Sequence, residues 1–139
     1  MDSYERTIAM EVDPDEVFGF VSNPENLPQF LPTLHRAEKL QGERIRIQGV
    51  SHGHPYDTEG TFHVDKGARR IEWGSEGDHS YSGWLQVRQG DATPFVSEVT
   101  IELEFSQTPG GENRGEEVLA TIEQVLEAIR NHFLHTVRR

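Results

Sequence analysis

Apolar and polar residues alternate with a period of two along much of the chain between residues 34 and 105. Successive side chains of a β-strand point to opposite faces of a sheet, so this period is typical of strands with one buried face. The alternation is clearest in the run EVTIELEF, where every second residue is apolar: Val99, Ile101, Leu103 and Phe105. Strand-length runs of this kind cover residues 34–40, 44–49, 58–64, 69–74, 81–87 and 98–105.

Short turn signals separate these runs. The connecting segments QGE, SHGHP, DKGA, SEGDH and QGDATP are rich in Gly, Pro, Asp and Ser, which favour turns. Connections this short join antiparallel hairpins, whereas parallel strands need long crossovers. The N-terminal run YERTIAMEV alternates in the same way and adds a seventh strand. The sequence therefore predicts an antiparallel sheet with one face in water.

The stretch VDPDEVFGFVSNPENLPQFLP, residues 12–32, interrupts this pattern with two short helices. Asp13 is a good N-cap, and Pro14 suits the first helical position because its missing N–H is not needed there. The first helix must stop at Asn23-Pro24, since a residue before proline avoids the α conformation. A second helix is expected from there to about Phe30. Helices this short are marginal alone, so both must pack against a larger element.

The chain ends with a long amphipathic helix, predicted over residues 116–137. Its apolar positions recur at intervals of three and four, which places them on one face. They are Val118, Ile122, Val125, Leu126, Ile129, Phe133 and Val137. This stripe needs the dry face of the sheet as its partner.

The order of these elements resembles the helix-grip fold of the START-like or polyketide cyclase-like (SRPBCC) superfamily. The segments that carry the resemblance are DPDEVFGFVSNPENLPQFLP, RRIEWGSEG, YSGWLQV, SEVTIELEF and TIEQVLEAIRNHFL. Together they span nearly the whole chain. The resemblance implies an α+β fold with a seven-stranded antiparallel curved sheet, two short helices after strand 1 and a long C-terminal helix. It says little about activity, because these segments are structural and one fold serves many functions.

Members of that superfamily keep a cavity between the curved sheet and the long helix, so the resemblance implies a pocket here. Strand parity and helix periodicity then suggest which side chains face it. The predicted ligand-binding residues are Phe30, Leu31, Phe62, Trp73, Tyr81, Leu85, Ile101, Leu126, Ile129 and Phe133. Trp84 has the opposite parity to Tyr81 and is expected on the convex face.

The sequence also allows a solid core built from the same side chains. Gly60 and Gly83 share the cavity parity and leave space, which favours a cavity over a filled core. In a helix-grip fold the two short helices close the narrow end of the sheet, and their apolar side chains are expected to plug it. We expect Phe18 or Phe20 to be packing residues there, whereas Phe30 or Leu31 should border the cavity.

The composition is consistent with one domain covering residues 1–139. The chain has a mean hydropathy of -0.65 and 34% hydrophobic residues, enough for one sizeable core. It has no long apolar run that would span a membrane, and the start MDSYERT lacks the basic and apolar regions of a secretory signal. We therefore expect a cytoplasmic protein, and the absence of cysteine agrees with a reducing compartment.

The charge balance limits the partners. A net charge of -11 repels phosphate backbones, so nucleic acid is not expected as a partner. The expected partner is a small hydrophobic ligand, and the oligomeric state is left open.

The histidines raise the question of a metal site. His52 and His54 flank a glycine in a turn, and His63 follows on the next predicted strand. This spacing matches none of the established metal motifs, and a Gly/Pro turn is typical of exposed surface. We predict neither a metal nor another cofactor.

Candidate groups for acid–base catalysis are scattered rather than grouped into a motif. They are His35, His63, Glu72, Tyr81 and Glu98, and Glu72 is expected to face water. Three functions stay open. The first is binding or transport of a lipid-like or polycyclic ligand. The second is a polyketide cyclase or dehydratase with Tyr81 or a pocket histidine as proton donor, and the third is a co-chaperone-like interaction module with a filled core.

Overall fold

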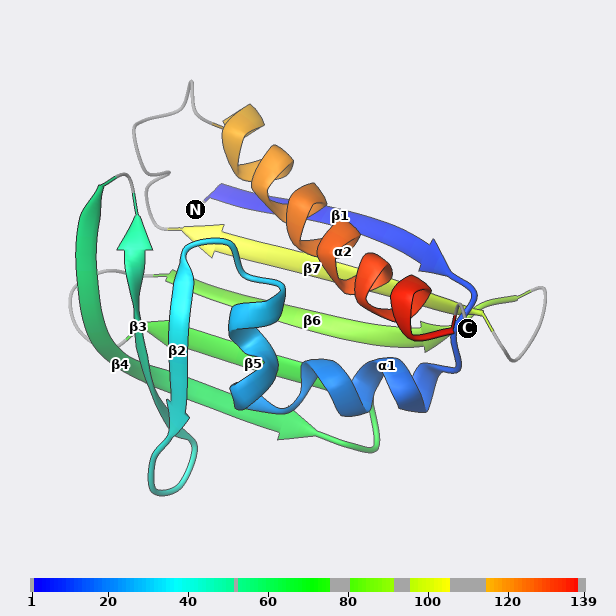
Figure 1. The fold of residues 1–139 in the computed structure, drawn as a ribbon, viewed down its shortest axis with the longest axis horizontal. Helices are drawn as coiled ribbons and strands as arrows, with labels where there is room; N and C mark the ends of the chain where they lie inside the picture. Colours follow the sequence, from blue (N-terminus) through cyan, green and yellow to red (C-terminus); the bar gives the residue numbers. More distant parts are fainter. Residues whose placement is uncertain (1, 52, 76–80, 92–95, 106–114, 138–139) are drawn as a thin grey trace.

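The computed structural model describes residues 2–51, 53–75, 81–91, 96–105 and 115–137 (Figure 1). Its elements follow the predicted order: β1 (Asp2–Met10), α1 (Pro14–Val21), η1 (Pro24–Gln29), β2 (Leu34–Lys39), β3 (Arg44–Ser51), β4 (His54–Asp65), β5 (Arg70–Ser75), β6 (Tyr81–Gln89), β7 (Ser97–Phe105) and α2 (Gly115–Val137).

All seven strands form one antiparallel sheet in the order β1-β7-β6-β5-β4-β3-β2. Figure 1 shows the sheet curling at the end that carries β2, β3 and the first half of β4, while α2 crosses the β1 and β7 end. The helices α1 and η1 lie on the same side of the sheet as α2. The predicted α+β fold with a curved seven-stranded sheet and a long C-terminal helix is therefore confirmed.

The two short helices begin as their caps predict. The side chain of Asp13 accepts a hydrogen bond from the backbone N–H of Asp15 at 2.8 Å, and Asn23 accepts one from Glu25 at 3.1 Å. The second helix is a 3₁₀ helix, which the sequence did not specify. In an α-helix the ring of Pro28 would clash with the carbonyl four residues earlier, so the 3₁₀ winding fits better.

Strand β4 begins at His54, four residues before its predicted start. The β3–β4 hairpin pairs Ser51 with His54, and Gly53 in the turn has a φ of +79°, which glycine adopts without strain. Pro55 lies next to this turn, close to the beginning of the strand, where proline is tolerated. The segment His54–Asp57, which looked like part of a loop, therefore continues the strand.

The strand register separates the two faces as the alternation predicted. Ile71, Leu85 and Ile101 lie side by side across β5, β6 and β7 on the helix-covered face, and all three are buried. Trp84 lies on the opposite face. There its indole N–H donates to the Glu102 carboxylate, and the Arg70 guanidinium lies 4.2 Å from its ring centroid. The expected convex position of Trp84 is confirmed.

An aromatic cluster fills the narrow end of the fold, beneath the C-terminal half of α2. The ring of Phe20 lies 5.5 Å from those of Phe30 and Phe133 and stacks on His132 at 3.9 Å. Phe18 and Phe20 are buried core residues, which agrees with their expected packing role. This cluster fixes α1 and η1 against the long helix.

Candidate functional site

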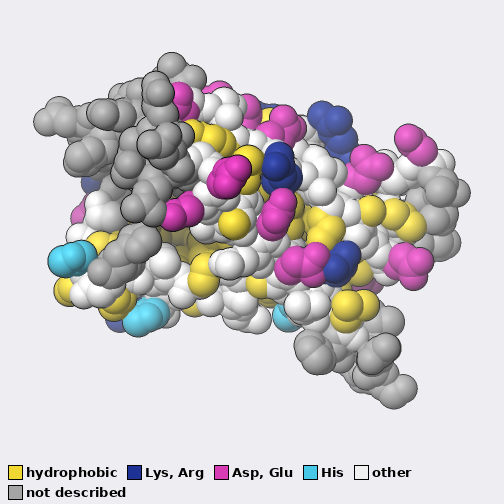
Figure 2. Space-filling model, turned by 90° about the horizontal axis from the view of Figure 1, so that it is seen from above, with side chains coloured by type: hydrophobic (Ala, Val, Ile, Leu, Met, Phe, Trp, Pro, Cys, Tyr) yellow, Lys and Arg dark blue, Asp and Glu magenta, His cyan; other side chains and the backbone are white. Residues whose placement is uncertain are grey.

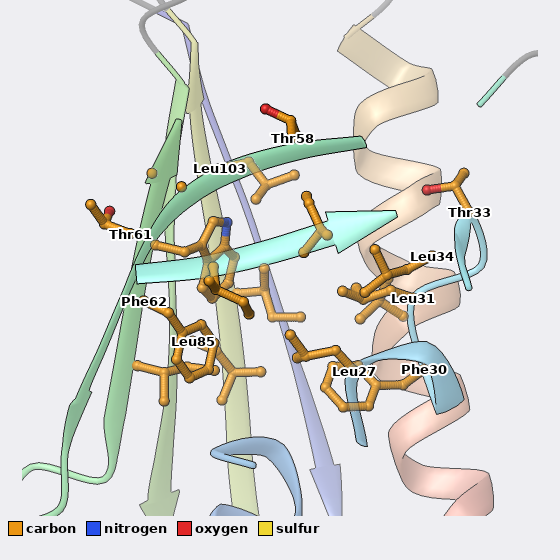
Figure 3. Close-up of a pocket in the computed structure, with 18 of the residues that line it drawn as sticks. Leu27, Phe30, Leu31, Thr33, Leu34, Thr58, Thr61, Phe62, Leu85 and Leu103 are labelled. Atoms are coloured by element: carbon orange, nitrogen blue, oxygen red, sulfur yellow. The ribbon is translucent and has the colours of Figure 1, made fainter. Parts of the chain in front are cut away.

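A cavity of about 380 Å³ lies on the concave face of the sheet and borders the aromatic cluster at Phe30. One wall is the η1–β2 segment, the floor comes from β3 to β7, and the N-terminal half of α2 contributes the rest. The side chains that line it are mostly aliphatic or aromatic (Figure 3). They include Leu27, Phe30, Leu31, Leu34, Ile45, Ile47, Tyr56, Phe62, Ile71, Trp73, Leu85, Ile101, Leu103, Ile122 and Val125.

The floor of the cavity is shaped by Trp73 and its register partner Gly83. A β-carbon on Gly83 would lie 2.7 Å from three atoms of the Trp73 indole. The indole therefore occupies the space that Gly83 leaves. The sequence pattern had suggested that this glycine leaves the space empty, whereas a large aromatic ring from the neighbouring strand uses it.

Six of the predicted ligand-binding residues line the cavity: Phe30, Leu31, Phe62, Trp73, Leu85 and Ile101. The backbone of Tyr81 belongs to β6, but its side chain lies outside the part of the chain that the structure describes. The arrangement brings the six together from β4, β5, β6, β7 and the end of η1. Their ligand-binding role stays a prediction.

The predicted roof residues Leu126, Ile129 and Phe133 do not line the cavity. All three are buried on the expected face of α2, but they lie further along the helix. The ring of Phe20 packs against Phe133 and fills the space below this part of α2. The roof is formed one turn earlier, by Thr121, Ile122 and Val125.

The sequence reasoning missed the contribution of β3 and of the first half of β4. Ile45 and Ile47 point inward from β3, and Tyr56 and Thr58 share the inward parity of Phe62. The alternation RIRIQG carried this signal for β3. Tyr56 lies between the turn signal SHGHP and the predicted start of the strand at residue 58, so the alternation did not include it.

The polar part of the lining is a group of hydroxyls. The hydroxyl oxygens of Tyr56 and Thr33 lie 3.2 Å apart, and either one can donate to the other. Figure 3 shows Thr33 and Thr58 at one end of the cavity, and Leu27, Phe30, Phe62 and Leu85 toward the other. Thr33, Tyr56 and Thr58 thus form a group of hydroxyls at one end of a mainly apolar cavity.

Gly49 allows Tyr56 and Thr33 to meet. A β-carbon there would lie 2.6 Å from the Tyr56 hydroxyl oxygen and 2.1 Å from the Thr33 carbonyl oxygen. That carbonyl accepts a hydrogen bond of 3.0 Å from the backbone N–H of Val50. The close approach of three chain segments thus holds the Tyr56 hydroxyl in a defined place.

Charged side chains of β3 and β4 pair with one another on the outer face. The Arg44 guanidinium lies 2.6 Å from the Glu59 carboxylate, and Arg46 binds Asp57 through two hydrogen bonds of 2.8 and 2.6 Å. The hydrogen bonds from Arg46, and next from Gln48, lower the pKa of Asp57 to about 2. These pairs stabilise the hairpin and leave the inner face to apolar and hydroxyl groups.

Tyr81 aside, the residues predicted as candidates for acid–base catalysis do not line the cavity. His63 lies on the outer face, where its Nδ1 pairs with the Glu43 carboxylate, and Glu72 pairs with Arg70. Glu98 stands opposite Arg88 on that face, and His35 is exposed on β2. Their positions follow from strand parity, which sends alternate side chains away from the helices.

The metal question was raised by His52, His54 and His63. His52 lies outside the described residues, and His54 is exposed beside the β3–β4 turn. Within the described ranges, no three His, Cys, Asp or Glu side chains are grouped so that they could hold a metal ion. In the same residues, no helix is both long and apolar enough to cross a membrane.

Comparison with known proteins gives a family and a fold. A family model described as polyketide cyclase/dehydrase and lipid transport matches residues 1–136. No curated protein matches the chain. Among solved structures, a START superfamily protein from Mycobacterium smegmatis superposes with a TM-score of 0.79 at 14% identity, covering 97% of this chain and 99% of that one.

Two aromatase/cyclases are also similar in structure. The di-domain aromatase/cyclase BexL has a TM-score of 0.80 at 22% identity, and the match covers 100% of this chain but 48% of BexL. The chain thus spans about half the length of that protein. The ZhuI aromatase/cyclase from a Streptomyces species has a TM-score of 0.73 at 14% identity, covering 99% of this chain and 96% of that one. At these identities the likeness shows the fold alone.

Proposed function

Because the chain belongs to the polyketide cyclase/dehydrase and lipid transport family, we propose that it binds or carries a small hydrophobic ligand in the cavity between the sheet and α2. The ligand is lipid-like or polycyclic. The observation that carries this proposal is the cavity itself: about 380 Å³ lined mainly by aliphatic and aromatic side chains. Pockets for small molecules commonly have volumes of about 300–1,000 Å³ and apolar walls with few polar groups.

The cavity supports a binding function over an interaction module. A co-chaperone-like module would use a filled core and an apolar patch on the surface. Among the described residues, only Val50 and Leu134 are large exposed hydrophobic side chains, and they lie on β3 and α2. In the described part of the chain, the apolar surface available for recognition is therefore mainly that of the cavity.

The proposal can be tested by native mass spectrometry of protein purified from its host, followed by uptake from a panel of lipids and polycyclic compounds. We expect a bound hydrophobic molecule or uptake from the panel. An empty protein that takes up nothing from the panel would overturn the proposal. A space-filling variant sharpens the test, because Ile47→Phe adds bulk inside the cavity and should reduce uptake.

Val50→Phe is the matched control for Ile47→Phe. Both residues are β-branched and lie on β3, but Val50 points to the outer face and is 39% exposed. The control should bind like the wild type. Equal loss of uptake in both variants, with both still folded by circular dichroism, would contradict the cavity as the binding site.

A second candidate function is a cyclase or dehydratase acting on a polyketide-like substrate. It is favoured by the family and by the two aromatase/cyclases that share the fold. The Tyr56 hydroxyl supplies a proton donor in the lining of the cavity, 3.2 Å from the exposed Thr33 hydroxyl. His63 loses this role, because its side chain is on the outer face.

Turnover separates the two candidates. If the protein is an enzyme, purified protein should change the product of a reactive poly-keto chain, and Tyr56→Phe should lower that rate while binding is largely retained. A carrier would bind the chain and leave its spontaneous products unchanged. Tyr4→Phe, which removes a hydroxyl outside the cavity, should match the wild type in either case.

A further inference from the structure

We infer that the ligand is uncharged and carries a hydroxyl or carbonyl group at the end that meets Tyr56 and Thr33. This inference rests on the proposed function and narrows it to one class of ligand: neutral amphiphiles. It arises from the position of one group of hydroxyls in the lining: Thr33 and Thr58 lie at one end of the cavity, with Leu27 and Phe30 toward the other (Figure 3), and the Tyr56 hydroxyl lies 3.2 Å from that of Thr33.

The hydroxyl pair has hydrogen-bonding capacity left for a ligand. Each hydroxyl offers one donor and two acceptor sites. The 3.2 Å contact between Tyr56 and Thr33 uses one donor and one acceptor of the pair. One O–H and several lone pairs then remain, so the pair can accept from a ligand hydroxyl or donate to a ligand carbonyl.

The pair is held rigidly enough to act as a recognition element. Tyr56 is half-buried and Thr33 is exposed, but the Tyr56 hydroxyl lies against the backbone of Gly49 and the Thr33 carbonyl accepts a hydrogen bond of 3.0 Å from the Val50 N–H. A hydrogen-bonding group that is already ordered loses little freedom when a ligand binds. The geometry therefore favours a ligand whose polar group reaches this place.

A ligand anion is disfavoured by the charge of the protein. The chain has 24 acidic and 13 basic residues, and acidic side chains predominate on the face shown in Figure 2. The arginines of β3, Arg44 and Arg46, are engaged by Glu59 and Asp57 on the outer face, and Arg36 on β2 lies 3.8 Å from the Glu38 carboxylate. Burying a carboxylate among apolar side chains without a charged partner is costly.

A ligand cation is disfavoured by the same ion pairs. Glu59 is the one charged residue among those that line the cavity in the described part of the chain. Its carboxylate lies 2.6 Å from Arg44 and shares the outer-face parity of Asp57. A ligand ammonium group would have to compete with that arginine, whereas a neutral group meets the hydroxyl pair directly.

Four naphthalene derivatives of similar size test the inference by calorimetric titration: naphthol, methylnaphthalene, naphthoate and naphthylmethylamine. At pH 7 naphthol is neutral, because a phenolic hydroxyl titrates near 10, and methylnaphthalene has no group that titrates. Naphthoate and naphthylmethylamine are charged. We expect naphthol to bind most tightly, with an affinity roughly fivefold above that of methylnaphthalene, the gain of one hydrogen bond. Both charged compounds should bind more weakly than methylnaphthalene.

Variants connect that preference to the hydroxyl pair. In Tyr56→Phe the ratio of the naphthol affinity to the methylnaphthalene affinity should fall to about one. Thr33→Val should reduce this ratio as well. Methylnaphthalene affinity should be unchanged in both. Tyr4→Phe, which removes a hydroxyl outside the cavity, should keep the wild-type preference.

The outcomes separate this inference from the proposed function. If methylnaphthalene binds and either charged compound binds more tightly than naphthol, the cavity is a binding site but the inference is wrong. The inference also fails if the preference for naphthol survives in Tyr56→Phe. If none of the four compounds binds, the inference is overturned, and the proposed function is decided by the uptake panel.

Discussion

The indole of Trp73 rests on the α-carbon of Gly83, its register partner on β6, so closely that a β-carbon would lie 2.7 Å from three ring atoms. Gly83→Ala should therefore push the indole into the cavity and strain the packing around it. We expect a loss of about 1–3 kcal/mol in the free energy of unfolding, the usual cost of overpacking. Urea denaturation measures it.

Gly19→Ala is the control for that substitution. Gly19 is exposed within α1, and a β-carbon there would meet nothing within 4 Å. Alanine should stabilise this helix by about 0.5–1 kcal/mol. If Gly83→Ala were as stable as the wild type, the close contact between Trp73 and Gly83 would be disproved.

Ile129 tests the packing of α2 on the sheet. Its side chain is 0% exposed, so Ile129→Asp places an unpaired carboxylate in the core. We expect a loss of more than about 4 kcal/mol in the free energy of unfolding, or a protein that does not fold. Thermal denaturation followed by circular dichroism measures the effect.

Leu134→Asp provides the comparison on the same helix. Leu134 is 50% exposed, and its substitution should change the free energy of unfolding by no more than about 0.5 kcal/mol. If the two variants melted at the same temperature, the assignment of the buried face of α2 would be wrong.

The Arg46–Asp57 pair should make part of the stability depend on acid. Hydrogen bonds from Arg46 and Gln48 lower the pKa of Asp57 from 3.8 in the unfolded chain to about 2 in the folded one. A group with a lowered folded pKa stabilises the fold fully above its unfolded pKa. This contribution is therefore present above pH 3.8 and is lost as the pH falls toward 2.

Asp57→Asn measures that contribution. The urea midpoint of the wild type should fall more steeply between pH 3.8 and pH 2 than that of the variant, which has no carboxylate to protonate there. Arg46→Gln should flatten the profile in the same window. Identical pH profiles for the wild type and Asp57→Asn would contradict the proposed pKa of this group.

Strand parity predicted the floor of the cavity because a sheet leaves little freedom. Once Ile101 is placed on the buried face, antiparallel pairing fixes Leu85, Ile71 and then Phe62 on the same face. The convex position of Trp84 follows from the same rule. The fold could therefore be predicted from the order of elements, and the residues of the central strands from their alternation.

The position of the roof could not be predicted in this way. Periodicity tells which face of α2 is buried, but not how far along the sheet the helix lies. That is decided by the packing of Phe20 against Phe133 and His132, a contact between residues more than 100 positions apart in the chain. Such contacts leave no pattern in a local window of sequence.

Tyr56 was missed for a different reason. Its neighbours Pro55 and Asp57 favour turns, so the segment resembles the end of a loop. The two-residue hairpin at Gly53 brings the segment into the sheet, and Pro55 is tolerated next to the turn. Pairing with β3 outweighed the local preference of these residues for a turn.

The most direct test of the binding cavity uses the two tryptophans, which lie on opposite faces of the sheet. Each gives an indole N–H signal in a nitrogen–proton correlation spectrum, and Trp73→Phe and Trp84→Phe assign the two signals. Titration with methylnaphthalene should shift the signal of Trp73, which lines the cavity, and leave that of Trp84 beside Glu102 in place. A shift of the Trp84 signal alone, or of neither signal at saturating ligand, would contradict a hydrophobic binding site on the concave face.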